Sequence, residues 1–184
     1  MDAAGYEALR LSLLVSGTAT LLGLPLALGC AWLLARRNFR GKDLLSAAIH
    51  LPLVLPPVVT GYLLLLSFGR TAPVGRFLEQ TLGLVLAFRW TGAVLAAMVM
   101  GFPLMVRAMR LAIEAVDPRI EAAAATLGAP RYAVFATITL PLIAPGILAG
   151  TVMGFAKALG EFGATITFVA AIPGQTQTLP SAIY

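Results

Sequence analysis

Residues 11–35 read LSLLVSGTATLLGLPLALGCAWLLA and contain no charged side chain. An α-helix needs about 20 predominantly apolar residues to cross the hydrocarbon core of a bilayer, and this stretch is long enough. A cleaved signal peptide would carry positive charge before a shorter apolar run, whereas Asp2, Glu7 and Arg10 precede this run and Arg36 follows it. We therefore predict a first membrane span that stays in the protein.

The composition of the whole chain also indicates lipid as its main solvent. Of its 184 residues 59% are hydrophobic and 11% are charged, with a mean hydropathy of +0.91, whereas soluble domains carry about 25% charged residues. The net charge of +5 comes from Lys and Arg residues that are clustered between the apolar blocks. We therefore interpret these residues as determinants of membrane topology and not as a nucleic-acid-binding surface. The single cysteine, Cys30, is interpreted as a small hydrophobe in an apolar stretch.

Three further apolar blocks follow the first span. Residues 44–68 contain Pro56 and Pro57, which remove helical hydrogen bonds, so we expect a kinked or partly unwound helix there. The block at 90–106 is short for a span unless its helix continues to about residue 109. The fourth block runs from about residue 142 to 169. The prediction is an all-α, polytopic bundle with about four spans.

The distribution of positive residues predicts the orientation, because loops rich in Lys and Arg stay in the cytoplasm. The first and third connections hold eight positive residues, and the N-terminal tail and the second connection hold four. We therefore expect the N-terminus outside and both richer connections inside. The outer connection at 69–89, with its Gly and Pro, is expected to form a turn and a short interfacial helix.

The connection between the third and fourth spans contains a helix signal. Pro118 suits the first turn of a helix, and Glu121 is followed by four alanines, the best helix formers. Gly128 has the conformational freedom that ends a helix. We predict a short cytoplasmic helix followed by a sharp turn.

This segment resembles the EAA loop of type I ABC importer permeases, a coupling helix that docks on an ATPase. The loop is placed at residues 107–141, and its later Ile-x-Leu-Pro pattern matches residues 138–141. Glu121 departs from the pattern, because the usual Glu falls at Ala122 when counted back from Gly128, and adjacent helix positions point about 100° apart. The resemblance assigns ATPase coupling to Glu121, Ala122, Ala123, Gly128, Ile138, Leu140 and Pro141.

Three other stretches narrow the family. Residues 51–61 (LPLVLPPVVTG), 157–165 (KALGEFGAT) and 175–184 (QTQTLPSAIY) resemble segments of molybdate permeases, with sulfate permeases close behind. Lys157 and Ala171 depart from the pattern, where Arg and Asn are expected. The resemblance implies a type 1 transmembrane domain over residues 9–184, a fragment whose fifth span would follow.

The charged residues of the fourth block are candidates for the translocation path. A charge near the bilayer centre costs about 2.5 to 3.5 kcal/mol, so Lys157 and Glu161, four residues apart, should pair and face protein or water. The pair either lines the path or holds helices together. Broken helices also free backbone groups that can contact an anion. The candidate path or gate comprises Pro56, Pro57, Thr60, Gly61, Lys157, Glu161 and Thr165.

Several catalytic and metal-binding motifs are absent from the sequence. It has no G-x-x-x-x-G-K-[ST] loop, so ATP is expected on a separate subunit, and no H-E-x-x-H, G-x-S-x-G or Cys/His set, so we expect neither enzyme activity nor a cofactor or metal on this chain. The resemblance implies an inner-membrane location and three partners: an ATP-binding subunit, a periplasmic oxyanion-binding protein and a second permease copy. The alternatives are a sulfate or tungstate permease, and a secondary transporter subunit without an ATPase.

Overall fold

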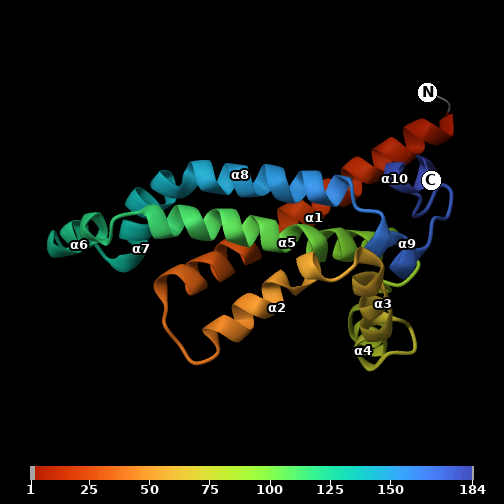
Figure 1. Ribbon diagram of the computed structural model, residues 1–184, viewed down its shortest axis with the longest axis horizontal. Coiled ribbons are helices and arrows are strands. Elements are labelled where there is room, and N and C mark those ends of the chain that lie inside the picture. Colours follow the sequence, from red (N-terminus) through yellow and green to blue (C-terminus); the bar gives the residue numbers. More distant parts are fainter. Residues whose placement is uncertain (1–2, 184) are drawn as a thin grey trace.

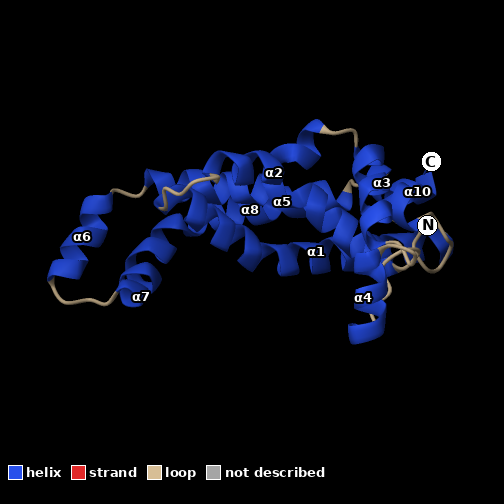
Figure 2. Ribbon diagram, turned by 90° about the horizontal axis from the view of Figure 1, so that it is seen from below, coloured by secondary structure: helices blue, strands red, loops and turns tan. Residues whose placement is uncertain are grey.

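The computed structural model describes residues 3–183, and those residues form helices joined by loops, without a strand (Figure 2). The elements are α1 (Ala3–Arg36), α2 (Lys42–Val54), α3 (Pro57–Phe68), α4 (Pro73–Leu82), α5 (Trp90–Ala115), α6 (Pro118–Thr126), α7 (Arg131–Val134), the π-helix η1 (Phe135–Thr139), α8 (Leu140–Leu159), α9 (Gly163–Val169) and α10 (Leu179–Ile183). The all-α prediction is confirmed.

Three helical stretches of the described chain are long and apolar enough to cross a membrane: Gly5–Arg36, Trp90–Ala115 and Arg131–Leu159. The last combines α7, η1 and α8. In Figure 1, α1, α5 and α8 lie along one another and form the body of the bundle. The pair α2 and α3 adds a fourth span if the two helices are counted together. The predicted polytopic bundle is therefore confirmed, with three or four spans.

The second apolar block is broken more sharply than a kink, because α2 and α3 differ in direction by 117°. Leu55 and Pro56 each precede a proline, which disfavours the α conformation, and both adopt ψ values near those of extended chain, 143° and 135°. Pro57 then starts α3 at a position where its missing N–H is harmless. Single prolines inside α1, α5 and α8 leave those helices continuous. The second block is broken where these three helices are continuous because it contains two consecutive prolines.

The ends of the other spans also differ from the prediction. The third span continues past residue 109 to Ala115, and the fourth begins at Arg131. The fourth block is not one helix up to residue 169: α8 ends at Leu159, a break covers residues 160–162, and α9 follows. Gly160 is the C-cap of α8 and Gly163 is the first residue of α9, and both lower the helix propensity of this stretch. A prediction based on hydropathy does not take helix propensity into account.

The helix α5 is the centre of the core. Ala93, Ala96, Ala97 and Val106 on this helix are buried, and small side chains allow close approach of α1 and α8. Where α8 crosses α5, a Cβ on Gly146 of α8 would lie 2.2 Å from Cβ of Ala112. The glycine is therefore required by packing.

The bundle separates two groups of short elements at its ends. The start of α1 lies at one end with α4, α9 and α10, and α6 and α7 lie at the other, as Figure 1 shows. A short helix is present in the predicted outer connection, as α4. The residues predicted to face outside and those of the predicted coupling loop are thus at opposite ends.

Candidate functional site

Two broken helices meet at one end of the bundle, and we call their meeting point the helix-break junction (residues 56–61 and 157–165). A Cβ on Gly61 of α3 would lie 2.5 Å from the carbonyl oxygen of Ala164, and a Cβ on Gly163 would lie 2.8 Å from Cβ of Pro57. The two backbones are therefore in direct contact. The structure brings together candidate path residues that are about a hundred positions apart in the sequence.

Glu161 is the charged residue at the centre of the helix-break junction, with a side chain only 1% exposed. Its Oε2 accepts a hydrogen bond from Lys157 Nζ at 2.8 Å, and its Oε1 accepts one from the backbone N–H of Ala164 at 2.9 Å. The predicted pair is present. Glu161 is, however, not on the same helix as Lys157, because it follows the end of α8 and its carboxylate caps the first turn of α9.

Two threonines in the helix-break junction differ in their hydrogen bonding. Thr165 is buried, and its hydroxyl donates to the carbonyl oxygen of Phe162 at 2.9 Å. Thr60 is also buried, yet its Oγ1 has no hydrogen-bond partner among the described residues. A buried hydroxyl without a partner is rare and calls for an explanation such as a bound water or ion. The Thr60 hydroxyl is thus an unsatisfied polar group buried in the helix-break junction.

The opposite end carries α6 with the predicted helix signals in place. The Asp117 side chain accepts from the backbone N–H of Arg119 at 2.9 Å and caps the helix, and Pro118 occupies its first turn. Gly128 has φ of +84°, the left-handed conformation that glycine adopts most easily. The predicted short helix and turn are confirmed.

The residues assigned to ATPase coupling do not all share one surface. Ala122, Ala123 and Gly128 are exposed, and the neighbouring Leu127, at 90% exposure, is an apolar residue that sequence reasoning missed. Ile138 lies in η1, and Leu140 and Pro141 begin α8; the first two are half-buried and Pro141 is exposed. These three belong to the base of the fourth span and not to the tip of α6.

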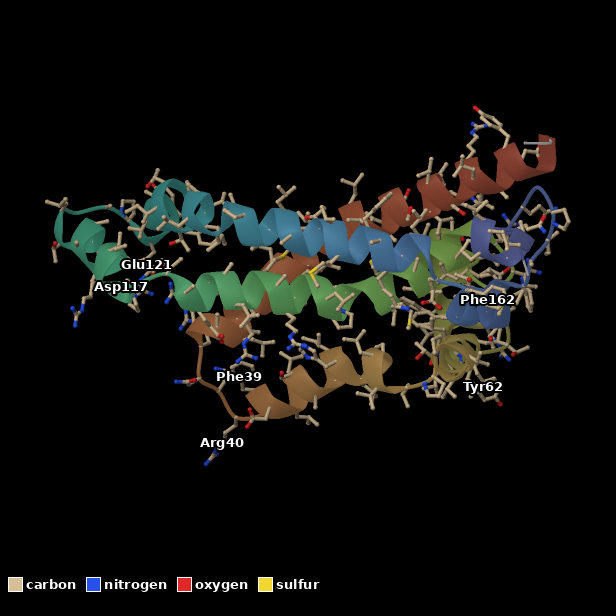
Figure 3. The ribbon with its side chains drawn as sticks, turned by 45° about the horizontal axis from the view of Figure 1, so that its top comes forward. Phe39, Arg40, Tyr62, Asp117, Glu121 and Phe162 are labelled. Atoms are coloured by element: carbon tan, nitrogen blue, oxygen red, sulfur yellow. The ribbon has the colours of Figure 1, made fainter. Side chains whose placement is uncertain are left out.

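Glu121 points away from the exposed surface of α6 and into the bundle. Its Oε1 accepts from an Nη of Arg36 at 2.9 Å and from Oγ1 of Thr139 at 2.7 Å. Figure 3 places Glu121 beside Asp117 at the end opposite to Tyr62 and Phe162. A cavity of about 790 Å³ lies beside this contact, between α1, α6 and α7. Sequence reasoning did not single out Arg36 or Thr139 for this role, since neither is near Glu121 in the sequence.

Long apolar helices and a contact between two broken helices indicate a polytopic membrane protein. The chain belongs to the family of binding-protein-dependent transport system inner membrane components, whose model matches residues 23–184. It is therefore an inner-membrane permease component, as predicted, and it has the type I importer permease fold.

The chain is similar to named permeases over nearly its whole length. It is 61% identical to the molybdenum transport system permease protein ModB of Escherichia coli (strain K12), over 97% of this chain and 78% of that protein. The protein of the same name in Haemophilus influenzae is 59% identical with the same coverage of both chains. The sulfate transport system permease protein CysW of Synechococcus elongatus is 38% identical, over 95% of this chain and 60% of that protein.

Proposed function

We propose that this chain is the membrane-spanning permease subunit of an ATP-driven molybdate importer. The observation that carries the proposal is the 61% identity, over 97% of the chain, to a molybdenum transport permease. Sulfate permeases are related at lower identity, which places the chain nearer the molybdate branch. The complex comprises a second copy of this permease, a separate ATP-binding subunit, and an external binding protein that delivers the oxyanion.

The tip formed by α6 is the docking site for the ATPase. Its exposed residues Ala122, Ala123 and Leu127 form a small apolar surface, and Gly128 directs the chain back toward the bundle. Small side chains let a partner approach the helix closely, and the exposed Leu127 can fill a pocket on that partner. The surplus of Lys and Arg at this end supports a cytoplasmic position, where the ATPase is located.

The helix-break junction is the gate of the translocation path. Lys157 is 31% exposed, so its ammonium group can meet an anion, while the buried Glu161 balances its charge. The buried hydroxyl of Thr60, which has no partner among the described residues, can donate to an oxyanion oxygen once the junction opens. A balanced charge pair binds a dianion weakly, and weak binding suits a path, because the substrate must leave as readily as it enters.

The function is tested by reconstituting the permease with its ATPase and its binding protein in liposomes. We expect molybdate to stimulate ATP hydrolysis and to accumulate inside. Tungstate and sulfate are tested in parallel, because tetrahedral dianions of equal charge differ mainly in size. Stimulation by sulfate alone would refute the molybdate assignment. Uptake by the permease without any ATPase would refute the importer assignment and favour a secondary transporter.

A further inference from the structure

The carboxylate of Glu121 connects three elements that are distant in the sequence. We propose that Glu121 is a positioning residue that ties the docking helix α6 to the first span through Arg36 and to the fourth span through Thr139. We call these three residues the carboxylate bridge. Its role is to carry a displacement of α6 into the spans, so the inference rests on the proposed coupling to an ATPase.

The carboxylate bridge has short hydrogen bonds and is partly buried. One oxygen of Glu121 accepts both hydrogen bonds, at 2.9 Å from Arg36 and 2.7 Å from Thr139. The Arg36 and Glu121 side chains are 19% and 25% exposed, and Thr139 is buried. Hydrogen bonds that involve a charged group are about twice as strong as neutral ones, and partial burial limits their screening. The bridge is therefore stronger than a surface ion pair.

The carboxylate bridge also joins α6 to α1. A cavity of about 790 Å³ lies beside the two helices at this level, and Arg36 and Glu121 both line it. The backbone of α6 packs on α7 and η1. Side chains, and not close backbone packing, therefore make the link between α6 and the first span, and this link can be removed by single substitutions.

The π-helix η1 sets the direction in which the Thr139 side chain points. A π turn inserts one residue into a helix, and one residue corresponds to about 100° of rotation in an α-helix. Thr139 is the last residue of η1, so its hydroxyl reaches Glu121 in the register that this turn sets. Such insertions occur frequently at functional sites. A change between π and α geometry would turn Thr139 away from the carboxylate.

Beyond η1 the fourth span is continuous up to the helix-break junction. The helix α8 has 20 residues from Leu140 to Leu159 and carries Lys157 in its last turn. It links Thr139 at one end to the Lys157–Glu161 pair at the other. A displacement of α6 that pulls on Thr139 therefore acts on one helix whose far end holds the gate residues.

The test uses the reconstituted complex with the variants Thr139→Val, Arg36→Met and Glu121→Gln. We expect the ATPase to co-purify with each variant and basal hydrolysis to persist. The oxyanion-stimulated part of hydrolysis should fall at least about fivefold, the lower end of couplings between distant sites. Thr139→Ser keeps the hydroxyl and should restore stimulation. Glu114→Gln breaks an exposed ion pair with Arg110 at the same end of the bundle and should leave stimulation unchanged.

Four outcomes would overturn the inference. Stimulation equal to that of the parent in both Thr139→Val and Arg36→Met would show that the bridge transmits nothing. Loss of ATPase co-purification in Glu121→Gln, with Thr139→Val and Arg36→Met unaffected, would make Glu121 a docking contact instead. A drop in Glu114→Gln as large as in Thr139→Val would make the effect one of general stability. A parent complex that binds no ATPase would refute the proposed function as well, whereas the first outcome refutes the carboxylate bridge alone.

Discussion

Lys157→Met removes one half of the charge pair at the helix-break junction. The lost ammonium donates to Glu161 at 2.8 Å, and the carboxylate left behind has a side chain only 1% exposed. Breaking a buried pair from one side costs about 3 to 5 kcal/mol, because the remaining charge lacks compensation. The N–H of Ala164 still donates to Oε1, so we expect a loss at the lower end, about 3 kcal/mol.

The reverse substitution should be milder. Glu161→Gln keeps the side-chain volume and an oxygen for the Ala164 N–H, and the Lys157 that it leaves unpaired is 31% exposed and thus less buried than the carboxylate. We expect a loss of about 1 kcal/mol, the value of one hydrogen bond. The double variant buries no charge at all, so its loss should be smaller than the sum of the two by about 2 kcal/mol.

The assay is unfolding of the purified variants in one detergent, by denaturant or by heat, with the parent as reference. The three differences in the free energy of unfolding close a double-mutant cycle and give the interaction energy of the pair. Two results would refute the reasoning. One is a Lys157→Met variant no less stable than Glu161→Gln. The other is a double variant whose loss equals the sum of the single losses within about 0.5 kcal/mol.

The remaining predictions concern topology, packing and coupling. In a cysteine-free background, a cysteine at the exposed Arg119 should resist an impermeant thiol reagent in intact spheroplasts while one at the exposed Gln175 reacts, and the reverse pattern would overturn the orientation. Gly61→Ala should destabilise the protein by about 1 to 3 kcal/mol, because its Cβ would lie 2.5 Å from a backbone oxygen of α9. Gly17→Ala, which meets nothing within 4 Å, is the matched control in the same unfolding assay. Gly128→Val forces a β-branched residue to φ of +84° and should disturb the turn after α6. The variant should reach the membrane normally but lose ATPase co-purification or stimulated hydrolysis. Normal uptake would contradict the docking role.

The sequence allowed the spans and the helix α6 to be predicted, because hydropathy and helix-capping signals are local. The residues from Asp117 to Gly128 specify their own helix and turn, and the structure has both. The two prolines at 56 and 57 located the break of the second span. They did not give the 117° between its halves, since α3 takes its direction from packing against α9.

The features that could not be predicted from the sequence depend on contacts between segments that are distant in the chain. Glu121 has partners 85 and 18 residues away, Arg36 and Thr139, and no spacing rule connects the three. The π geometry that directs Thr139 was also not predicted from residues 135–139. The shift of Glu121 by one position from the family pattern was visible, yet its consequence, an inward carboxylate, required the fold.

The charged pair in the fourth block was expected either to line the path or to hold helices together. The structure favours a different one of these roles for each of its two residues. Both oxygens of Glu161 are engaged, one by Lys157 and one by the N–H that opens α9, so its carboxylate holds two helix ends together. Lys157 has three N–H donors, and Glu161 is the acceptor for one of them. Because the lysine is partly exposed and Glu161 is not, Lys157 is the better candidate to meet a passing oxyanion. Lost transport in a Glu161 variant would therefore not identify a path residue, whereas lost transport in Lys157→Gln with ATPase association intact would.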